Sequence, residues 1–167
     1  VYTGADDAGH FFGDYCNWRR IPEYEAVVRG SPAAALARQL MGSRQATFFH
    51  EHVLVKEPGT DKPTPWHHDQ PYYCVDGEQN VSLWIPLDPV SRDSAVEFIA
   101  GSHNWDAWFT PKKFVGEDYQ ETDRDFERMP DIDGHRADYD LRGAALASGD
   151  CVAFQFRTVH GAPGNRA

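Results

Sequence analysis

Four short segments rich in β-forming residues, separated by turns, most constrain the fold of this 167-residue chain. They are residues 48–56, 81–87, 95–99 and 151–156. Aromatic and β-branched side chains dominate them, as is usual in strands. The first ends at the turn residues Pro58 and Gly59, and the last begins after Gly149. Short strands at irregular intervals favour a β-sandwich or jelly roll over alternating βαβ units.

The first part of the chain, residues 1–45, is expected to be helical. Pro22 suits the first turn of one helix, and Gly30 ends it. A second helix is expected over residues 33–41, which are strong helix formers, and Gly42 ends that helix. The sequence therefore predicts a mainly β fold with N-terminal helices.

Residues 104–148 form a long, charged stretch with little periodicity. A loop of this length within a compact domain is usually functional or disordered, and we expect an insert folded over the mouth of the barrel. The length of the chain suits one domain better than two. We expect a single domain 1–167, made of a helical flank 1–45, jelly-roll strands in 46–103 and 149–167, and an insert or lid 104–148.

The composition narrows the class of partner. A net charge of −10 disfavours nucleic acid, which would require a basic face. No apolar run approaches the roughly 18 residues of a membrane span. Cys16, Cys74 and Cys151 lack C-x-x-C spacing, which is typical of reduced thiols in a cytoplasmic protein. A small molecule is the expected partner, while the oligomeric state is left open.

The strongest local signal is the run His67, His68 and Asp69. Alternate side chains of an extended segment share a face, so His67 and Asp69 point together and His68 points away. His160 follows an apolar strand near the end of the sequence and can supply a second imidazole. Two histidines and one carboxylate on one face of an octahedron favour non-haem Fe(II). An isolated H-x-D pair also occurs by chance in many proteins, so the distal histidine matters.

The other histidines are weaker candidates. His50 and His52 share a strand face and could form a second metal site, although nothing else indicates one. His103 lies in a turn after a strand, where structural hydrogen bonding is favoured over catalysis. His10 and His135 are expected to be solvated.

Five blocks in this order resemble the phytanoyl-CoA dioxygenase family. They are WHHD at 66–69, LWIPLD at 83–88, FIAGSH at 98–103, GD at 149–150 and HGAPGN at 160–165. The likeness runs from about Phe48 to Ala167. It implies a double-stranded β-helix (a cupin-like jelly roll), an Fe(II) cofactor, and 2-oxoglutarate and O2 as cosubstrates.

The resemblance also implies roles for particular residues. His67, Asp69 and His160 fall on the iron ligands of the family. Trp84 falls on a tryptophan that lines the cosubstrate pocket. His52 falls near a position that contacts 2-oxoglutarate in relatives, with a different residue type there.

The sequence departs from the family in two places. Ala162 stands where the family usually has a serine. The arginine that binds the distal carboxylate of 2-oxoglutarate is expected past Ala167, since Arg166 comes too early, and we expect the natural chain to continue. The family's carboxylate ligand is retained as Asp69, whereas halogenating relatives replace it, so the resemblance favours hydroxylation.

The predicted function is hydroxylation of a small organic molecule by an Fe(II)- and 2-oxoglutarate-dependent dioxygenase. Candidate substrate contacts are Tyr72, Tyr73, Trp105 and Trp108, for which simple packing is an equally good interpretation. Two alternatives remain open. One is a cupin-type metal enzyme that does not use 2-oxoglutarate, and the other is a non-catalytic jelly-roll binding module.

Overall fold

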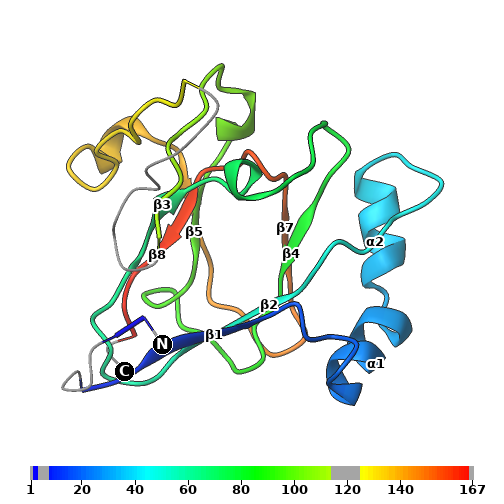
Figure 1. Ribbon diagram of the computed structural model, residues 1–167. Coiled ribbons are helices and arrows are strands. Elements are labelled where there is room, and N and C mark those ends of the chain that lie inside the picture. Colours follow the sequence, from blue (N-terminus) through cyan, green and yellow to red (C-terminus); the bar gives the residue numbers. More distant parts are fainter. Residues whose placement is uncertain (1, 4–7, 114–124, 166–167) are drawn as a thin grey trace.

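The computed structural model describes residues 2–3, 8–113 and 125–165, and antiparallel strands dominate it (Figure 1). The strands are β1 (Phe11–Tyr15), β2 (His52–Lys56), β3 (Thr64–His67), β4 (Ser82–Trp84), β5 (Glu97–Ile99), β6 (Leu141–Arg142), β7 (Val152–Phe154) and β8 (His160–Ala162). The helices are α1 (Pro22–Gly30) and α2 (Ala33–Leu40), with 3-10 turns η1 (Gln70–Tyr72), η2 (Ser102–Asn104) and η3 (Arg136–Asp138).

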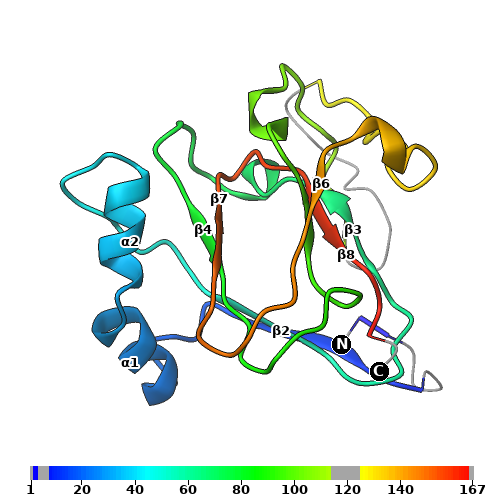
Figure 2. The same cartoon turned by 180° about the vertical axis from the view of Figure 1, so that it is seen from behind.

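The described strands form three antiparallel sheets. The largest has the order β3-β8-β5-β6, and two pairs, β1-β2 and β4-β7, stand apart from it. The β4-β7 pair lies across the molecule from the four-stranded sheet, and β1-β2 runs along one side between them (Figures 1 and 2). Strands distant in the sequence, such as β3 and β8, therefore lie side by side.

Each of the four predicted β segments contains a strand, and the two predicted helices are confirmed. Residues 1–45 are not wholly helical, however, because β1 precedes the helices. Its sequence, Phe-Phe-Gly-Asp-Tyr, contains two residue types that are depleted in strands. Pairing with β2 in the register Phe11↔Lys56 to Tyr15↔His52 makes it extended.

Helices α1 and α2 lie beyond the β4-β7 pair, on the side away from the large sheet (Figure 1). Pro22 begins α1, and Glu25 and Arg29 form an i,i+4 ion pair of 2.7 Å on it. Neither helix has a fully buried residue. No helix in the described part of the chain is both long and apolar enough to cross a membrane. The three cysteines are free and exposed.

The stretch 104–148 contributes to the core. Phe109 and Ile132, which belong to it, are buried together with Ile99 and Val159 in one hydrophobic cluster. The same stretch supplies β6 at the edge of the large sheet. Its described parts are therefore more than a cover, because they bury apolar surface that the sheet would otherwise expose. A lid role remains a prediction, and residues 114–124 lie outside the described residues.

Candidate metal centre

Neighbouring strands bring the three predicted ligands together. His67 ends β3 and is the register partner of His160, which begins β8. Asp69 follows two residues after His67, immediately before η1. Its Oδ1 atom lies 3.7 Å from the Nε2 atom of each histidine. One donor atom from each residue lies within 4.8 Å of the other two.

Backbone carbonyls orient both imidazoles. Nδ1 of His67 donates to the carbonyl oxygen of Pro65 at 2.7 Å, and Nδ1 of His160 donates to that of Thr158 at 2.9 Å. A carbonyl oxygen can only accept, so the proton of each neutral ring is on Nδ1. The Nε2 atoms that face Asp69 therefore carry free lone pairs, as metal ligands require.

The carboxylate is held from a second sheet. Oγ of Ser82, the first residue of β4, donates to Oδ2 of Asp69 at 3.1 Å. The backbone N–H of Asp69 donates to the carbonyl of Phe156 at 2.8 Å. These two bonds leave Oδ1 directed at the histidines. The side chains of the three residues are 10–15% exposed, which leaves them reachable from one side.

Burial keeps His67 neutral. Desolvation, reinforced by the neighbouring His160, lowers the pKa of His67 to about 4, against the opposite effect of the Asp69 charge. At neutral pH this ring is thus already in the deprotonated form that binds a metal ion.

Aromatic rings enclose the two imidazoles. Phe98 stacks on His160 with centroids 5.8 Å apart, and Phe154 approaches the same ring at 4.7 Å. Tyr72 meets His67 edge-on at 5.9 Å. Such contacts fix the ring orientations and lower the local dielectric.

The donor set suits a divalent cation, because two neutral nitrogens and one carboxylate oxygen converge without a hydrogen bond between the histidines and Asp69. Among the described residues, no other three His, Cys, Asp or Glu side chains come this close. For His50 and His52, no third such ligand joins them in the part of the chain that the structure describes, and a second site there remains a prediction.

His68 points away from the triad, as the strand alternation predicts. Its Nε2 atom accepts the backbone N–H of Phe109 at 3.1 Å. Burial lowers the pKa of His68 to about 4, so it stays neutral and can accept this bond. This hydrogen bond links the segment that follows β3 to the stretch 104–148.

Two predicted cosubstrate contacts lie on elements beside the triad. Trp84 is two residues from Ser82 on β4 and shares its face, the face that reaches Asp69. His52 lies on β2 against Tyr15, with ring centroids 5.2 Å apart. Burial lowers the pKa of His52, while the charge of Asp69 acts in the opposite direction. Their cosubstrate roles remain predictions.

The two tyrosines proposed as substrate contacts differ in their surroundings. The hydroxyl of Tyr72, whose ring meets His67, both donates to the carbonyl and accepts the N–H of Lys112, each at 2.7 Å. Tyr73 packs on Phe156 at 5.0 Å, and burial raises the pKa of its hydroxyl. Tyr72 is thus the one in contact with a triad ring.

The contacts of Trp105 and Trp108 favour a packing role for both side chains. Trp105 contacts the buried cluster through Phe109 at 6.1 Å and also lies 6.1 Å from Tyr139. Trp108 stacks on Phe126 at 6.3 Å. A substrate role for either remains a prediction. Arg166, considered for the distal carboxylate, lies outside the described residues.

Sequence reasoning missed Ser82 and the two carbonyls that orient the imidazoles. A serine within a strand gives no sign of which carboxylate it will meet, although its i,i+2 relation to Trp84 was a usable signal. The direction of a carbonyl depends on backbone torsions, which residue types do not specify.

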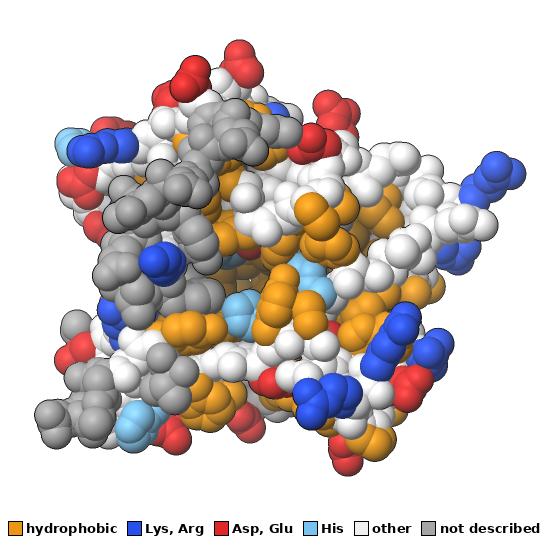
Figure 3. Space-filling view, in the orientation of Figure 1, with side chains coloured by type: hydrophobic (Ala, Val, Ile, Leu, Met, Phe, Trp, Pro, Cys, Tyr) orange, Lys and Arg blue, Asp and Glu red, His pale blue; other side chains and the backbone are white. Residues whose placement is uncertain are grey.

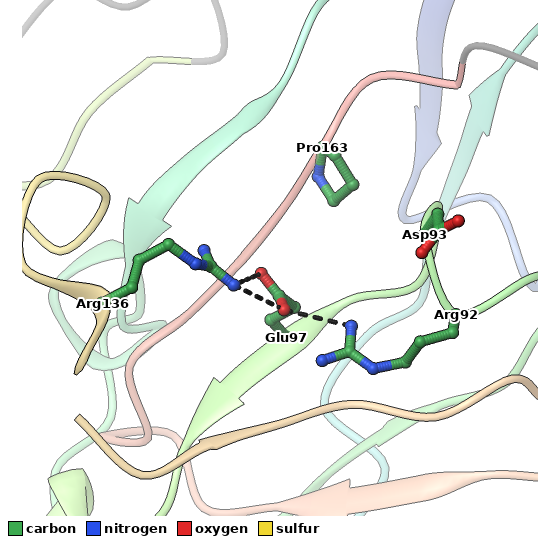
Figure 4. A pocket seen from close by; sticks show the side chains of 5 residues that line it. All are labelled: Arg92, Asp93, Glu97, Arg136 and Pro163. Carbon is green, nitrogen blue, oxygen red and sulfur yellow. Dashed lines mark hydrogen bonds and ion pairs between the residues drawn. The ribbon is translucent and has the colours of Figure 1, made fainter.

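The surface is hollowed on two sides. On the face seen in Figure 1, hydrophobic and histidine side chains gather around a hollow (Figure 3). The back of the large sheet has another pocket, of about 490 Å³, lined by Arg92, Asp93, Glu97, Arg136 and Pro163 (Figure 4). Arg136 donates to both oxygens of Glu97 at 2.9 Å, and Arg92 donates to one at 3.1 Å. Since Glu97 precedes Phe98 on β5, this network faces away from His160.

Known proteins share this architecture. The sequence model of the family described as Phytanoyl-CoA dioxygenase (PhyH) matches residues 4–167. SnoK, a non-haem α-ketoglutarate-dependent carbocyclase from nogalamycin biosynthesis, matches with a TM-score of 0.70 and 20% identity over 98% of this chain and 61% of its own. EvdO2 from Micromonospora carbonacea var. aurantiaca, complexed with 2-oxoglutarate, matches with a TM-score of 0.69 and 20% identity. The match covers 94% of this chain and 62% of EvdO2.

A third structure is the epimerase SnoN in complex with Fe3+, α-ketoglutarate and nogalamycin RO. It matches with a TM-score of 0.63 and 21% identity over 94% of this chain and 58% of its own. The chain thus spans about three fifths of the length of these structures. At this identity the likeness establishes a shared fold. No curated protein matches the sequence.

Proposed function

Because this chain belongs to the phytanoyl-CoA dioxygenase family, we propose that it is a non-haem Fe(II)- and 2-oxoglutarate-dependent oxygenase acting on a small organic molecule. The observation that carries the proposal is the triad itself. The free Nε2 lone pairs of His67 and His160 converge with Oδ1 of Asp69 at 3.7 Å. This donor set is the one that non-haem Fe(II) oxygenases use.

His67, Asp69 and His160 would hold the metal ion. Fe(II) bound by these residues would supply the means to activate O2 together with the 2-oxo acid. The residues of the chain fix the ligands: carbonyls set the tautomer of each imidazole, and Ser82 orients Asp69. The surrounding aromatic rings limit the access of water.

The fold supports the same conclusion. We propose that the sheets form a double-stranded β-helix, with residues 1–167 in one oxygenase domain. The four-stranded sheet carries both histidines, and the separate β4-β7 pair supplies Ser82. The fold shared with SnoK and EvdO2, two proteins described with α-ketoglutarate or 2-oxoglutarate, supports the cosubstrate.

Hydroxylation is the reaction that we propose. The retained carboxylate of Asp69 supports it over halogenation, in which the family gives up that ligand for a halide. The carbocyclase SnoK and the epimerase SnoN share the fold, so cyclisation and epimerisation are the alternatives within the same chemistry. Mass spectrometry of the product distinguishes them, because hydroxylation adds one oxygen atom and the other two add none.

An anaerobic titration tests the proposal. Fe(II) and 2-oxoglutarate bound together should give a visible charge-transfer absorbance band, which the variant Asp69→Ala should lose. His135→Ala, at an exposed histidine away from the triad, is the matched control and should retain the band. Folded parent protein without a band would overturn the proposal.

The same samples separate the alternatives. A cupin-type enzyme would bind a divalent metal, but 2-oxoglutarate would not change its melting temperature. A non-catalytic binding module would hold no metal, and His67→Ala would leave its ligand binding intact.

A further inference from the structure

Four aromatic side chains, which we call the aromatic wall, pack against one another beside the metal centre. The wall consists of Tyr15, Phe49, His50 and Tyr73. The ring of His50 is central, because the ring centroids of the other three members lie 4.8 or 4.9 Å from its own. The rings of Phe49 and Tyr73 also meet edge-on, with centroids 5.3 Å apart. The four rings therefore form one continuous apolar surface.

Tyr73 joins the aromatic wall to the triad. It directly follows η1, the turn that begins after Asp69, and its ring lies 5.0 Å from that of Phe156. The backbone carbonyl of Phe156 accepts the N–H of Asp69 at 2.8 Å. Burial raises the pKa of Tyr73 and lowers that of His50, and the charge of Asp69 acts upward on both. Both rings thus lie within electrostatic reach of the carboxylate ligand.

Strand alternation gives the wall an uncharged face. Tyr15 is the register partner of His52, and His50 lies two residues before His52 in the same extended segment, so the three rings share one face of the β1-β2 pair. Asp14 and Glu51 alternate to the other face, where their carboxylates accept hydrogen bonds from the turn before α1. The hollow in Figure 3, bordered by hydrophobic and histidine side chains, agrees with this placement.

The wall is open to solvent at its outer end. Tyr15 is 51% exposed and Phe49 is 43% exposed, while His50 and Tyr73 are half-buried. A group of exposed aromatic rings is typical of a surface that binds a ligand. Burial lowers the pKa of His50 and raises the pKa of Tyr15 and Tyr73, so all four rings are uncharged at neutral pH. The wall offers apolar ring contacts and no charge to pair with an ion.

We propose that the aromatic wall binds a flat, uncharged aromatic ring system of the substrate next to the metal centre. This inference rests on the proposed function and names the substrate class. Aromatic rings gain from offset-stacked or edge-to-face contacts with other aromatic rings, beyond the apolar area that they bury. A saturated ring buries similar area without these contacts, and an anionic ring loses hydration without gaining a cation.

Three probes of similar size test the proposal. 2-Naphthol is flat and uncharged, decahydro-2-naphthol is its saturated counterpart, and 2-naphthoate is negatively charged. Calorimetric titration of the full chain, under anaerobic conditions with Fe(II) and 2-oxoglutarate, measures each affinity. 2-Naphthol should bind about 5- to 100-fold more tightly than decahydro-2-naphthol, as expected for two ring contacts. It should bind at least about 10-fold more tightly than 2-naphthoate.

Two neighbouring phenylalanines provide a matched pair of variants. Phe48 and Phe49 are each 43% exposed, but Phe48 packs on Trp18 with ring centroids 5.4 Å apart and is not part of the wall. Phe49→Leu removes one ring and should weaken 2-naphthol by about 2- to 12-fold. It should leave the affinity for decahydro-2-naphthol largely unchanged. Phe48→Leu should alter neither affinity.

The visible charge-transfer band of the same samples reports whether the probe lies near the metal. Bound 2-naphthol should change the wavelength or intensity of the band, and Phe49→Leu should raise the concentration of 2-naphthol that is needed. An unchanged band at saturating 2-naphthol would place the ring site away from the metal and overturn the inference.

The remaining outcomes also overturn it, and they are separate from failure of the proposed function. A band without preference for 2-naphthol over the other two probes would contradict the substrate class alone. Equal weakening in Phe48→Leu and Phe49→Leu would assign the binding to the region of Trp18. A preference for 2-naphthol in folded protein that gives no band would overturn the proposed function and leave the wall as a binding surface without a metal-dependent role.

Discussion

The imidazole rings of His67 and His160 lie next to each other across the β3-β8 pair, with centroids 4.2 Å apart and the ring planes tilted by 50°. The Nδ1 atom of each ring donates to a backbone carbonyl, and the Nε2 atom of each ring faces Asp69. Two protonated rings at this distance would repel each other, and His160 accordingly lowers the pKa of His67. The pair is thus arranged to share a metal cation in place of two protons.

Ser82→Ala should lower the affinity of the protein for Fe(II) by about 10-fold, the lower end of the range for outer-shell partners of metal ligands. The hydroxyl of Ser82 holds Oδ2 of Asp69 at 3.1 Å, and without it the carboxylate is free to rotate. Competition with a fluorescent chelator under anaerobic conditions measures the effect. Ser91→Ala, at an exposed serine, is the control; equal affinities in both variants would contradict the proposed support.

His68→Gln should make the metal-free protein less sensitive to acid. The pKa of His68 falls from 6.5 to about 4 on burial. Between pH 4 and pH 6.5 the imidazole is therefore protonated in the unfolded chain and neutral in the folded chain. The stability from neutral His68 is fully present above pH 6.5 and is lost as the pH falls toward 4. For one histidine this amounts to about 2 kcal/mol between pH 7 and 5.

Glutamine can accept the N–H of Phe109 as His68 does, but it does not titrate in this range. Urea unfolding at pH 7 and pH 5 therefore compares the parent, His68→Gln and the exposed control His135→Gln. The loss on acidification should shrink in His68→Gln alone. An identical loss in all three proteins would show that His68 is not a source of the acid sensitivity.

The strands that the sequence predicts are those with β-branched or aromatic runs, such as β4 and β7. Strand β8 is only His-Gly-Ala and becomes extended through pairing with β3 and β5. Such pairing is decided by tertiary packing, which local propensity does not encode. The same reason limits the site: alternation places His67 and Asp69 together, while the approach of His160 depends on β8 and required the resemblance.

Ile132→Ala should destabilise the protein by about 2–5 kcal/mol, the usual range for removing a large aliphatic side chain from a core. Ile132 is 1% exposed within the buried cluster, although it belongs to the stretch that the sequence suggests as an insert. Chemical unfolding at neutral pH measures the change. Leu87→Ala, at a side chain that is 71% exposed, is the control. A near-neutral Ile132→Ala would restore the interpretation of this stretch as a dispensable cover.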